Sequence, residues 1–466
     1  MPTHSTQTRT PLVRHNAFPP TAPPRVRRVC LIALLAIAFL FASSGWNSIQ
    51  KRWADFEYFY KASAWLVHNG TMDPEIDRFE DGGIEARGGI PWYLPFVPRV
   101  FSVVSWMPMR VAGTIWLIFN LVLFFATLRL IGRYLSGLPP GDWMVTQLVP
   151  VLFLLAAWHW EFRLNQINNL TLFLLVASFA LWRRGRPNVS GLALGLAILV
   201  KLTPGLIAFW FLLKREFRVV GVAAVTVVVA GPLSDVIVFG PSYAADTYRA
   251  WARSALIDNS QRGLILRQVE MDWRNQAVGA LASRWLHRTS YTKHFDNDPR
   301  IHLDDSPAWI NVANLSLHTI AGGVLAFSAA SVLLLVWVAR HPARRLGEWR
   351  IRMEWALFVL AMLWLMPVMR RYHLIWALPA ISVLGGAIHY CGLRNAWGKF
   401  AVVCAASVCA AQLTLVLYLT NGTNLPEAAG VLLAPVLLLA SALIWRIVTI
   451  SRDPEAMPPP AEFADE

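Results

Sequence analysis

Long apolar stretches recur along the whole chain and are separated by shorter polar segments. Most of them are long enough, or nearly long enough, to cross a hydrocarbon core about 30 Å thick at about 1.5 Å per helical residue. The stretches occupy residues 29–46, 111–131, 143–158, 167–182, 219–239, 315–339, 353–369, 374–391, 399–420 and 428–446. The pattern predicts an all-α polytopic membrane protein with about 10–12 transmembrane segments.

One further apolar stretch, "VSGLALGLAILVKLTPGLIAFWFLL" at residues 189–213, is interrupted by Lys201 and Pro204. Each half would be only about 14–18 Å long, which is short for an ordinary span. Basic residues flank it on both sides, "RRGRP" before it and "KREFR" after it. If both flanks are cytoplasmic, the segment is a hairpin that enters the membrane and returns. A single kinked helix is the alternative, and it would place one basic flank outside.

The composition agrees with a membrane protein. Of the 466 residues, 56% are hydrophobic and only 15% are charged, whereas a soluble domain carries about 25% charged residues. The 22 tryptophans suit the two membrane–water interfaces. The net charge of +14 does not indicate a nucleic-acid partner, because the basic residues stand at the ends of apolar stretches. The four cysteines lie in or beside apolar stretches and predict no disulfide framework.

The distribution of Lys and Arg predicts the orientation, because short cytoplasmic loops are enriched in these residues. We expect residues 1–28 to be a disordered cytoplasmic N-terminus, 29–450 to be the transmembrane domain and 451–466 to be a disordered cytoplasmic tail. The first apolar stretch then acts as a signal anchor, and two long segments, 47–110 and 240–313, lie outside. The expected location is a cell (inner) membrane, with the functional site on the extracytoplasmic side.

Polar side chains gather on the predicted external face. Asp55 and Glu57 stand among aromatic residues in "RWADFEYFYKASAWLVHNG", directly after the first span. Further polar groups lie in the turn "WHWEFRLNQIN", the loop segment "IDNSQRGLILRQ" and the turn "MRRYH". Ionisable groups at membrane depth tend to be functional, and Arg163, Arg370 and Arg371 are the basic residues of short external turns.

These residue types suit a lipid-linked phosphate sugar. Arginine forks bind phosphate oxygens, a carboxylate can accept the proton of a sugar hydroxyl, and aromatic rings offer a stacking surface. The candidate phosphate ligands are Arg163, Lys201, Arg262, Arg370 and Arg371, and the candidate acceptor or sugar contacts are Glu57, Tyr58, Tyr60, Asn165, Gln166 and Tyr93. Asp55 is the candidate general base. We expect no metal and no other cofactor, because no His, Asp or Glu cluster has metal-ligand spacing and no Gly-rich loop suggests a nucleotide.

Several segments resemble glycosyltransferase family 87. "DFEYFYKASAWLVHNG" is similar to its first-loop signature, "RLNQINNLTLFLL" to its Gly-Gln-Val-Asn segment and "NSQRGLILR" to its Asn-Gln-Ser stretch. "SGLALGLAILVKLTPGL" resembles its hairpin and is the most specific match. Two features depart from the family pattern: Asn165 stands where the family has Gly, and "WYLPF" keeps only Tyr93 and Pro95 of a Tyr-Pro-Pro core.

The resemblance implies a C-type glycosyltransferase fold and an inverting, metal-independent transfer of mannose from a polyprenyl-phosphate donor to a glycolipid or glycan acceptor. It also implies that Asp55 is the catalytic base and that His373 assists proton transfer. Membrane lipids are the expected surroundings. The rival functions are a lipid-linked sugar transporter or flippase, a non-catalytic partner of a polysaccharide machine, and an arabinofuranosyl-type transferase of the same fold.

Each candidate also has a plainer interpretation. Asp55 can cap the following helix, and Arg163 can pair with Glu161, two residues away. His373 can bond a backbone carbonyl at the interface. Lys201 can satisfy the carbonyls that Pro204 frees in the interrupted stretch.

Overall fold

The computed structural model describes residues 21–51, 55–69, 93–252, 273–288, 290, 309–391, 396–413 and 425–452. Within these ranges every regular element is a helix, and none is a strand. The α-helices are α1 Pro24–Gln50, α2 Phe56–Asn69, α3 Phe96–Phe101, α4 Met109–Tyr134, α5 Trp143–Phe153, α6 Leu155–Arg163, α7 Asn168–Arg183, α8 Pro187–Val200, α9 Gly205–Leu213, α10 Phe217–Val228, α11 Ser234–Phe239, α12 Pro241–Ala252, α14 Val278–Leu286, α15 Leu317–Ala339, α16 Glu348–Leu365, α17 Leu378–Cys391, α18 Ala396–Gln412, α20 Leu425–Ala428 and α21 Leu433–Arg452. Short 3₁₀ turns are η1 Ser102–Val104, η2 Pro140–Asp142, η6 Ala343–Arg345 and η7 Arg371–Ala377, and a π turn, η3 Val229–Leu233, joins α10 to α11.

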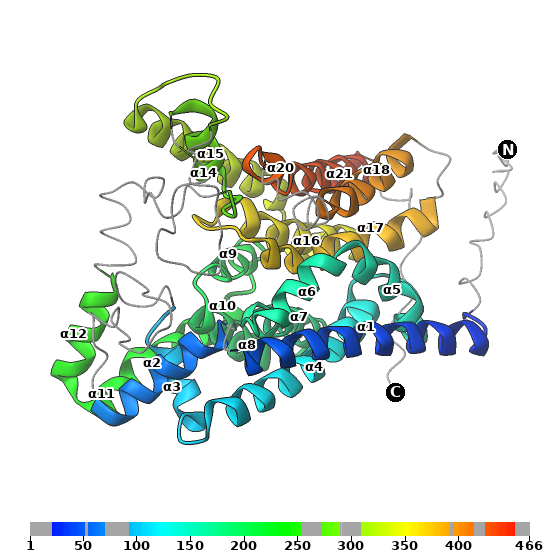
Figure 1. Cartoon of the computed structure of the whole chain (residues 1–466). Coiled ribbons are helices and arrows are strands. Elements are labelled where there is room, and N and C mark those ends of the chain that lie inside the picture. The colour runs from blue at the N-terminus through cyan, green and yellow to red at the C-terminus, as the bar shows by residue number, and fades with distance from the viewer. Residues whose placement is uncertain are drawn as a thin grey trace, which may run out of the picture.

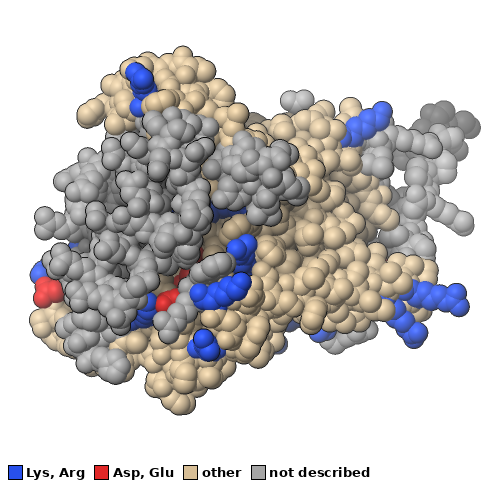
Figure 2. All heavy atoms as spheres, in the orientation of Figure 1, with Lys and Arg blue, Asp and Glu red and all other residues tan. Residues whose placement is uncertain are grey.

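The described helices confirm an all-α polytopic membrane protein. Six of them are long and apolar enough to cross a bilayer, and α5 with α6, bent by 82°, makes a seventh if counted as one broken span. Other predicted spans form shorter helices, such as the 16-residue α7 and the charge-bearing α16. Long helices such as α1 and α4 run across the view, with α2, α3, α11 and α12 at one end (Figure 1). The surface between the two ends shows few Lys, Arg, Asp or Glu side chains (Figure 2), as a lipid-facing belt requires.

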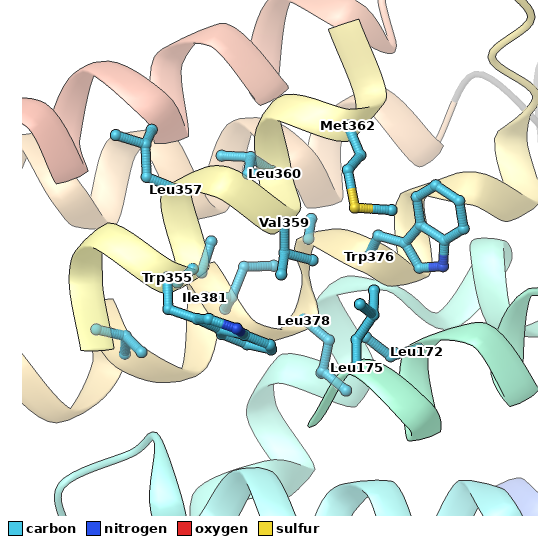
Figure 3. Close-up of a cluster of buried hydrophobic side chains, with 14 of the residues drawn as sticks. Leu172, Leu175, Trp355, Leu357, Val359, Leu360, Met362, Trp376, Leu378 and Ile381 are labelled. Atoms are coloured by element: carbon cyan, nitrogen blue, oxygen red, sulfur yellow. The ribbon is translucent and has the colours of Figure 1, made fainter. Parts of the chain in front are cut away.

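Helix α16 lies at the centre of the hydrophobic core. All its side chains from Met353 to Leu363 are essentially buried, so it has no lipid-facing side along this length. Figure 3 shows its Trp355, Val359 and Met362 packed with Trp376 and with leucines of α7. A helix that is apolar and buried all round is a core helix rather than a peripheral span.

Helices α8 and α9 form the hairpin that the interrupted stretch predicted. A Cβ at Gly191 would lie 2.6 Å from the carbonyl oxygen of Val219, and a Cβ at Gly195 would lie 2.8 Å from that of Ala223. Both contacts advance by four residues along α8 and α10, so these two helices run parallel and begin at the same level. The chain can reach the start of α10 only if α9 returns from the tip of α8. Lys201 therefore stands at the tip of a helical hairpin, and a single kinked helix over residues 189–213 does not fit this arrangement.

The base of this hairpin is anchored by Lys214, which directly follows α9. Its fully buried ammonium forms an ion pair with Glu354 of α16 and donates hydrogen bonds to the carbonyl oxygens of Ala339 and His341, both at 2.9 Å. Arg350 also donates a hydrogen bond to this carboxylate, at 2.7 Å. Burial lowers the pKa of Lys214, and the charge of Glu354 opposes that shift. The hairpin is thus fixed to α15 and α16 at one end and carries Lys201 at the other.

Candidate functional site

Asp55 lies directly before α2 and is tied to the turn between α6 and α7. The side-chain amide of Gln166 donates a hydrogen bond to Oδ2 of Asp55. The backbone N–H of Phe56 donates to the carbonyl oxygen of Leu164 at 3.4 Å. The beginning of α2 and the candidate base are therefore positioned by a turn more than 100 residues further along the chain.

This turn needs a left-handed residue. Asn165 has φ 49°, a conformation that costs most residues energy but that Gly and Asn adopt readily. Its backbone N–H donates to the carbonyl oxygen of Phe162 at 3.1 Å, and its own carbonyl accepts from Trp116 Nε1 at 3.0 Å. The geometry explains why Asn can stand where the resembled family has Gly. The predicted sugar contacts Asn165 and Gln166 are both buried, and the structure gives them a positioning role.

A chain of side-chain hydrogen bonds joins the hairpin tip to two other elements. The backbone N–H of Arg370 donates to Nδ1 of His373 at 2.9 Å, and Nε2 of His373 lies 2.8 Å from Nζ of Lys201. Nζ donates to Oδ1 of Asn168 at 2.9 Å, and Nδ2 of Asn168 donates to Glu161 at 3.0 Å. His373, Asn168 and Glu161 are buried. The predicted residues Lys201 and His373 are thus brought into direct contact.

Trp376 encloses this chain on one side. Nζ of Lys201 lies 4.9 Å from the centroid of its ring, within cation–π range, and the ring of His373 lies 5.6 Å away. The indole N–H donates to the backbone carbonyl of Asn168 at 3.3 Å. Trp376 therefore positions Asn168 through a hydrogen bond and lies against the side chain of Lys201.

The hydroxyl of Tyr93 lies within electrostatic range of both Asp55 and Glu161. Burial raises the pKa of its hydroxyl well above the usual range, and the neighbouring Tyr372, Asp55, Glu161 and Tyr58 raise it further. Both carboxylates are therefore near enough to Tyr93 for their charges to affect its pKa. Its ring also packs edge-on against a phenylalanine of α2. Tyr93 therefore remains a neutral hydrogen-bonding group at physiological pH.

Three other predicted residues have local partners. Glu57 forms an ion pair with Lys61 at 2.9 Å, one turn along α2. The hydroxyl of Tyr60 donates to the backbone carbonyl of Met107 at 2.6 Å, which ties α2 to the segment before α4. This hydrogen bond supports a structural role for Tyr60 more than the predicted role as a sugar contact. Tyr58 packs edge-on against the following phenylalanine.

The described arginines among the predicted phosphate ligands have different surroundings. The guanidinium of Arg163 lies 4.8 Å from the ring centroid of Trp160, and no ion pair joins it to Glu161 in the described part of the chain. Arg370 contributes its backbone N–H to His373, and Arg371 begins η7 and is half-buried. Arg262 lies outside the described residues, so its role stays a prediction.

Sequence reasoning missed the segment that supports the Arg370 turn. The backbone N–H of Gln276 donates to the carbonyl of Met369 at 2.7 Å, and Oδ1 of Asn275 accepts from the N–H of Met369 at 3.0 Å. Asn275 also donates to Pro367 at 3.3 Å. Both amides are buried. The available signal was the polar run "RNQ" directly before the apolar α14.

The arrangement is suited to holding an anion beside a carboxylate. Lys201, together with Arg370 and Arg371 beside His373, supplies nitrogen donors for an anion, while Asp55 supplies an acceptor for a proton. Among the described residues, no three His, Cys, Asp or Glu side chains are grouped so as to hold a metal ion. The geometry therefore fits an anionic group held by side chains next to a general base.

Comparison with known proteins confirms the resemblance seen in the sequence. Residues 92–313 match the model of glycosyltransferase family 87. This match begins after Asp55 and ends before Arg370, so the proposed base and the His373 turn lie outside it. No solved structure matches the chain.

The curated relatives come from mycobacteria. A polyprenol-phosphate-mannose-dependent alpha-(1-2)-phosphatidylinositol mannoside mannosyltransferase of Mycobacterium tuberculosis (strain ATCC 25618 / H37Rv) is 26% identical over 312 residues, which cover 63% of this chain and 61% of that protein. The protein of the same name from Mycolicibacterium smegmatis is 25% identical, covering 66% of this chain and 64% of that protein. A pentamannoside mannosyltransferase of M. tuberculosis (strain CDC 1551 / Oshkosh) is 23% identical, over 77% and 73% of the two chains. This chain thus matches only about three fifths of the length of the first two relatives.

Proposed function

We propose that this relative of glycosyltransferase family 87 is a membrane glycosyltransferase that moves mannose from a polyprenyl-phosphate donor to a glycolipid or glycan acceptor. The names of the mycobacterial relatives support this donor class. One observation in the structure carries the proposal. Gln166, which holds Asp55, and Asn168, which holds Lys201, are two residues apart in one buried turn.

In the proposed reaction Asp55 accepts the proton of an acceptor hydroxyl. The resulting oxygen attacks the anomeric carbon of the donor, and the bond from that carbon to the phosphate oxygen breaks with its electron pair on the phosphate. The leaving polyprenyl phosphate gains a negative charge, which Lys201 and the arginines of the next turn stabilise. In-line attack inverts the anomeric centre, so a β-linked donor gives an α-linked product.

The charge distribution supports an extracytoplasmic site. The end of the hairpin opposite Lys201 is strongly basic: it carries Arg183, Arg184, Arg186, Lys214 and Arg215. By the positive-inside rule this end faces the cytoplasm. Asp55, Lys201 and His373 then lie on the outer side of a cell membrane. A lipid-linked donor would present its phosphate and sugar at that depth.

The test is sugar transfer by the purified full-length protein in nanodiscs. Wild-type protein is expected to transfer label from radiolabelled polyprenyl-phosphate mannose to a phosphatidylinositol mannoside. Asp55→Asn should lower the rate roughly 10²- to 10⁴-fold, the usual contribution of a general base, while donor binding persists. Asp246→Asn, at an exposed aspartate of α12, is the matched control and should keep full activity.

Three outcomes would contradict the proposal. Full transfer by Asp55→Asn would remove the carboxylate from the mechanism. Movement of the donor across the bilayer by wild-type protein without any transfer would indicate a flippase. Transfer of a pentose from polyprenyl-phosphate arabinofuranose, in preference to mannose, would replace the donor sugar.

A further inference from the structure

The hydrogen-bond chain at the hairpin tip has a fixed direction. It starts at the backbone N–H of Arg370, which can only donate, and this N–H points at Nδ1 of His373 at 2.9 Å. Nδ1 must therefore carry the lone pair. In a neutral imidazole the proton then sits on Nε2, because one ring nitrogen donates and the other accepts.

That tautomer determines the state of Lys201. An Nε2–H group lies 2.8 Å from Nζ, and a hydrogen bond of this length requires a lone pair on Nζ. A lysine ammonium has three donors and no acceptor, so Nζ is an uncharged amine in this arrangement. It passes a hydrogen bond on to Oδ1 of Asn168, whose Nδ2 donates to Glu161. All four hydrogen bonds run the same way, from Arg370 to Glu161.

We propose that the Lys201–His373 pair binds the donor phosphate by taking up one proton. In the free protein the amine and the imidazole are hydrogen-bonded to each other, and after proton uptake both donate to the phosphate. This inference rests on the proposed function. The proton comes from solvent and adds to the lone pair of Nζ, which forms an ammonium. The ammonium can no longer accept from Nε2–H, so the two groups separate, and each donates to a phosphate oxygen.

The uncharged pair has a physical reason. His373 is only 4% exposed, and Asn168 and Glu161 are fully or nearly fully buried. Before a phosphate binds, an ammonium in this place would be a partly desolvated charge next to the cationic Arg370 turn, which is costly. The nearby carboxylate of Glu161 accepts hydrogen bonds from Asn168 and Asn169. The neutral pair removes that cost until a phosphate arrives to compensate the charge.

The charged neighbours do not change this assignment. Glu161 faces Lys201 from α6, and Arg370 faces His373 from its own turn. Glu161 already accepts hydrogen bonds from Nδ2 of Asn168 and, at 2.8 Å, from the backbone N–H of Asn169. Asp55 and Arg274 act on the adjacent Tyr372. Glu161 is the other group that could take up the proton. The Glu161→Gln variant distinguishes proton uptake by Glu161 from uptake by Lys201.

Proton uptake makes donor binding dependent on pH. If the free site holds an amine and the complex holds an ammonium, the dissociation constant falls as pH falls. The change is up to about tenfold per pH unit between the two protonation midpoints. A phosphodiester has a constant charge near neutral pH, so the protein is the source of any such dependence.

The experiment is isothermal titration calorimetry of the purified full-length protein with farnesyl methyl phosphate, a prenyl phosphodiester without a sugar. Titrations in Hepes and in Tris, whose ionisation enthalpies differ, give the number of protons bound with the probe. We expect about one proton taken up per probe molecule. Polyprenyl-phosphate mannose, also a phosphodiester, replaces the probe if the short chain does not bind.

Variants assign the proton. Lys201→Met should abolish uptake and weaken binding strongly. His373→Phe should weaken binding less, because it removes one of the two phosphate donors and leaves Lys201, and it should abolish uptake, because Nζ no longer has an Nε2–H group from which to accept. Glu161→Gln should keep the uptake. Lys399→Met, at an exposed lysine of α18, is the control and should behave like wild type.

The outcomes separate the two proposals. Binding of the probe to wild type without proton uptake overturns the inference and leaves the proposed function standing. Uptake that persists in Lys201→Met but disappears in Glu161→Gln assigns the proton to the carboxylate and also overturns it. If neither the probe nor polyprenyl-phosphate mannose binds to wild type, the proposed donor site itself is wrong.

Discussion

The side-chain amide of Gln166 donates a hydrogen bond to the carboxylate of Asp55, although the two residues are 111 positions apart. This hydrogen bond helps to orient the proposed base from the buried turn between α6 and α7. Because Asp55 stands outside the helix that follows it, this amide fixes the carboxylate more directly than the helix does.

Removal of this hydrogen bond should slow sugar transfer. A hydrogen bond to a charged group contributes about 1.5–3 kcal/mol, so Gln166→Leu should lower kcat roughly 10- to 100-fold. The donor dissociation constant should change little, because Lys201 has its own partners. Transfer rates and donor binding in nanodiscs measure the two effects. An unchanged kcat would show that the carboxylate needs no such support.

Asn165 should tolerate Gly and little else. Its φ of 49° suits Gly, so Asn165→Gly should leave the unfolding temperature within a few degrees of wild type. Asn165→Ala should cost about 1–2 kcal/mol, because Ala has a Cβ but lacks the short polar side chain that lets Asn adopt the left-handed region. Thermal unfolding in detergent compares the two variants. Equal stability of both would mean that the turn relaxes to another conformation.

The close contact between α8 and α10 should not accommodate a larger side chain at Gly195. A Cβ at Gly195 would come within 2.5 Å of Cβ of Thr226, so Gly195→Val should destabilise the protein by about 1–3 kcal/mol through overpacking. It should also displace Lys201 at the hairpin tip and weaken donor binding. Gly221→Ala in α10 is the matched control, since no atom lies within 4 Å of that Cβ. It should be neutral or slightly stabilising.

Tyr60 offers a test of packing against acceptor recognition. Its hydroxyl donates to the carbonyl of Met107 at 2.6 Å, so Tyr60→Phe should lose about 1 kcal/mol of stability with KM for the acceptor unchanged. A large rise in acceptor KM with unchanged stability would instead assign the hydroxyl to the substrate.

Membrane orientation can be measured by labelling. In a background without the native cysteines, His68→Cys and Ser290→Cys should react with an impermeant maleimide added outside intact cells. Arg186→Cys, at the base of the hairpin, should react only after the cells are opened. The reverse pattern would place Asp55 in the cytoplasm and contradict the proposed function.

Hydropathy was sufficient to predict the helical membrane fold and the interruption at Lys201, because both are local properties of the chain. The same holds for Asp55, whose place after a span is visible in the sequence. The hydrogen-bonded partners could not be predicted. Lys201 reaches His373 across 172 positions, and such a contact depends on how α7, α8 and η7 pack.

The arginines show the same limit in another form. The role of the Arg370 guanidinium stays a prediction, whereas the contact of its backbone N–H with Nδ1 of His373 could not be predicted, because every residue type except proline carries this group. The supporting amides of Asn275 and Gln276 were missed because the residue type does not indicate whether an amide side chain is buried or exposed.

The burial of α16 has a consequence for biogenesis. Its first turns carry Glu348, Arg350, Arg352 and Glu354. Charged residues disfavour membrane insertion, by up to about 2.5–3.5 kcal/mol for one at the centre of a helix. Lys214, which neutralises Glu354, is synthesised earlier, together with the hairpin. The nascent α16 should therefore leave the translocon only after the preceding helices are in place to pack against it, and the order of translation becomes part of how this protein is assembled.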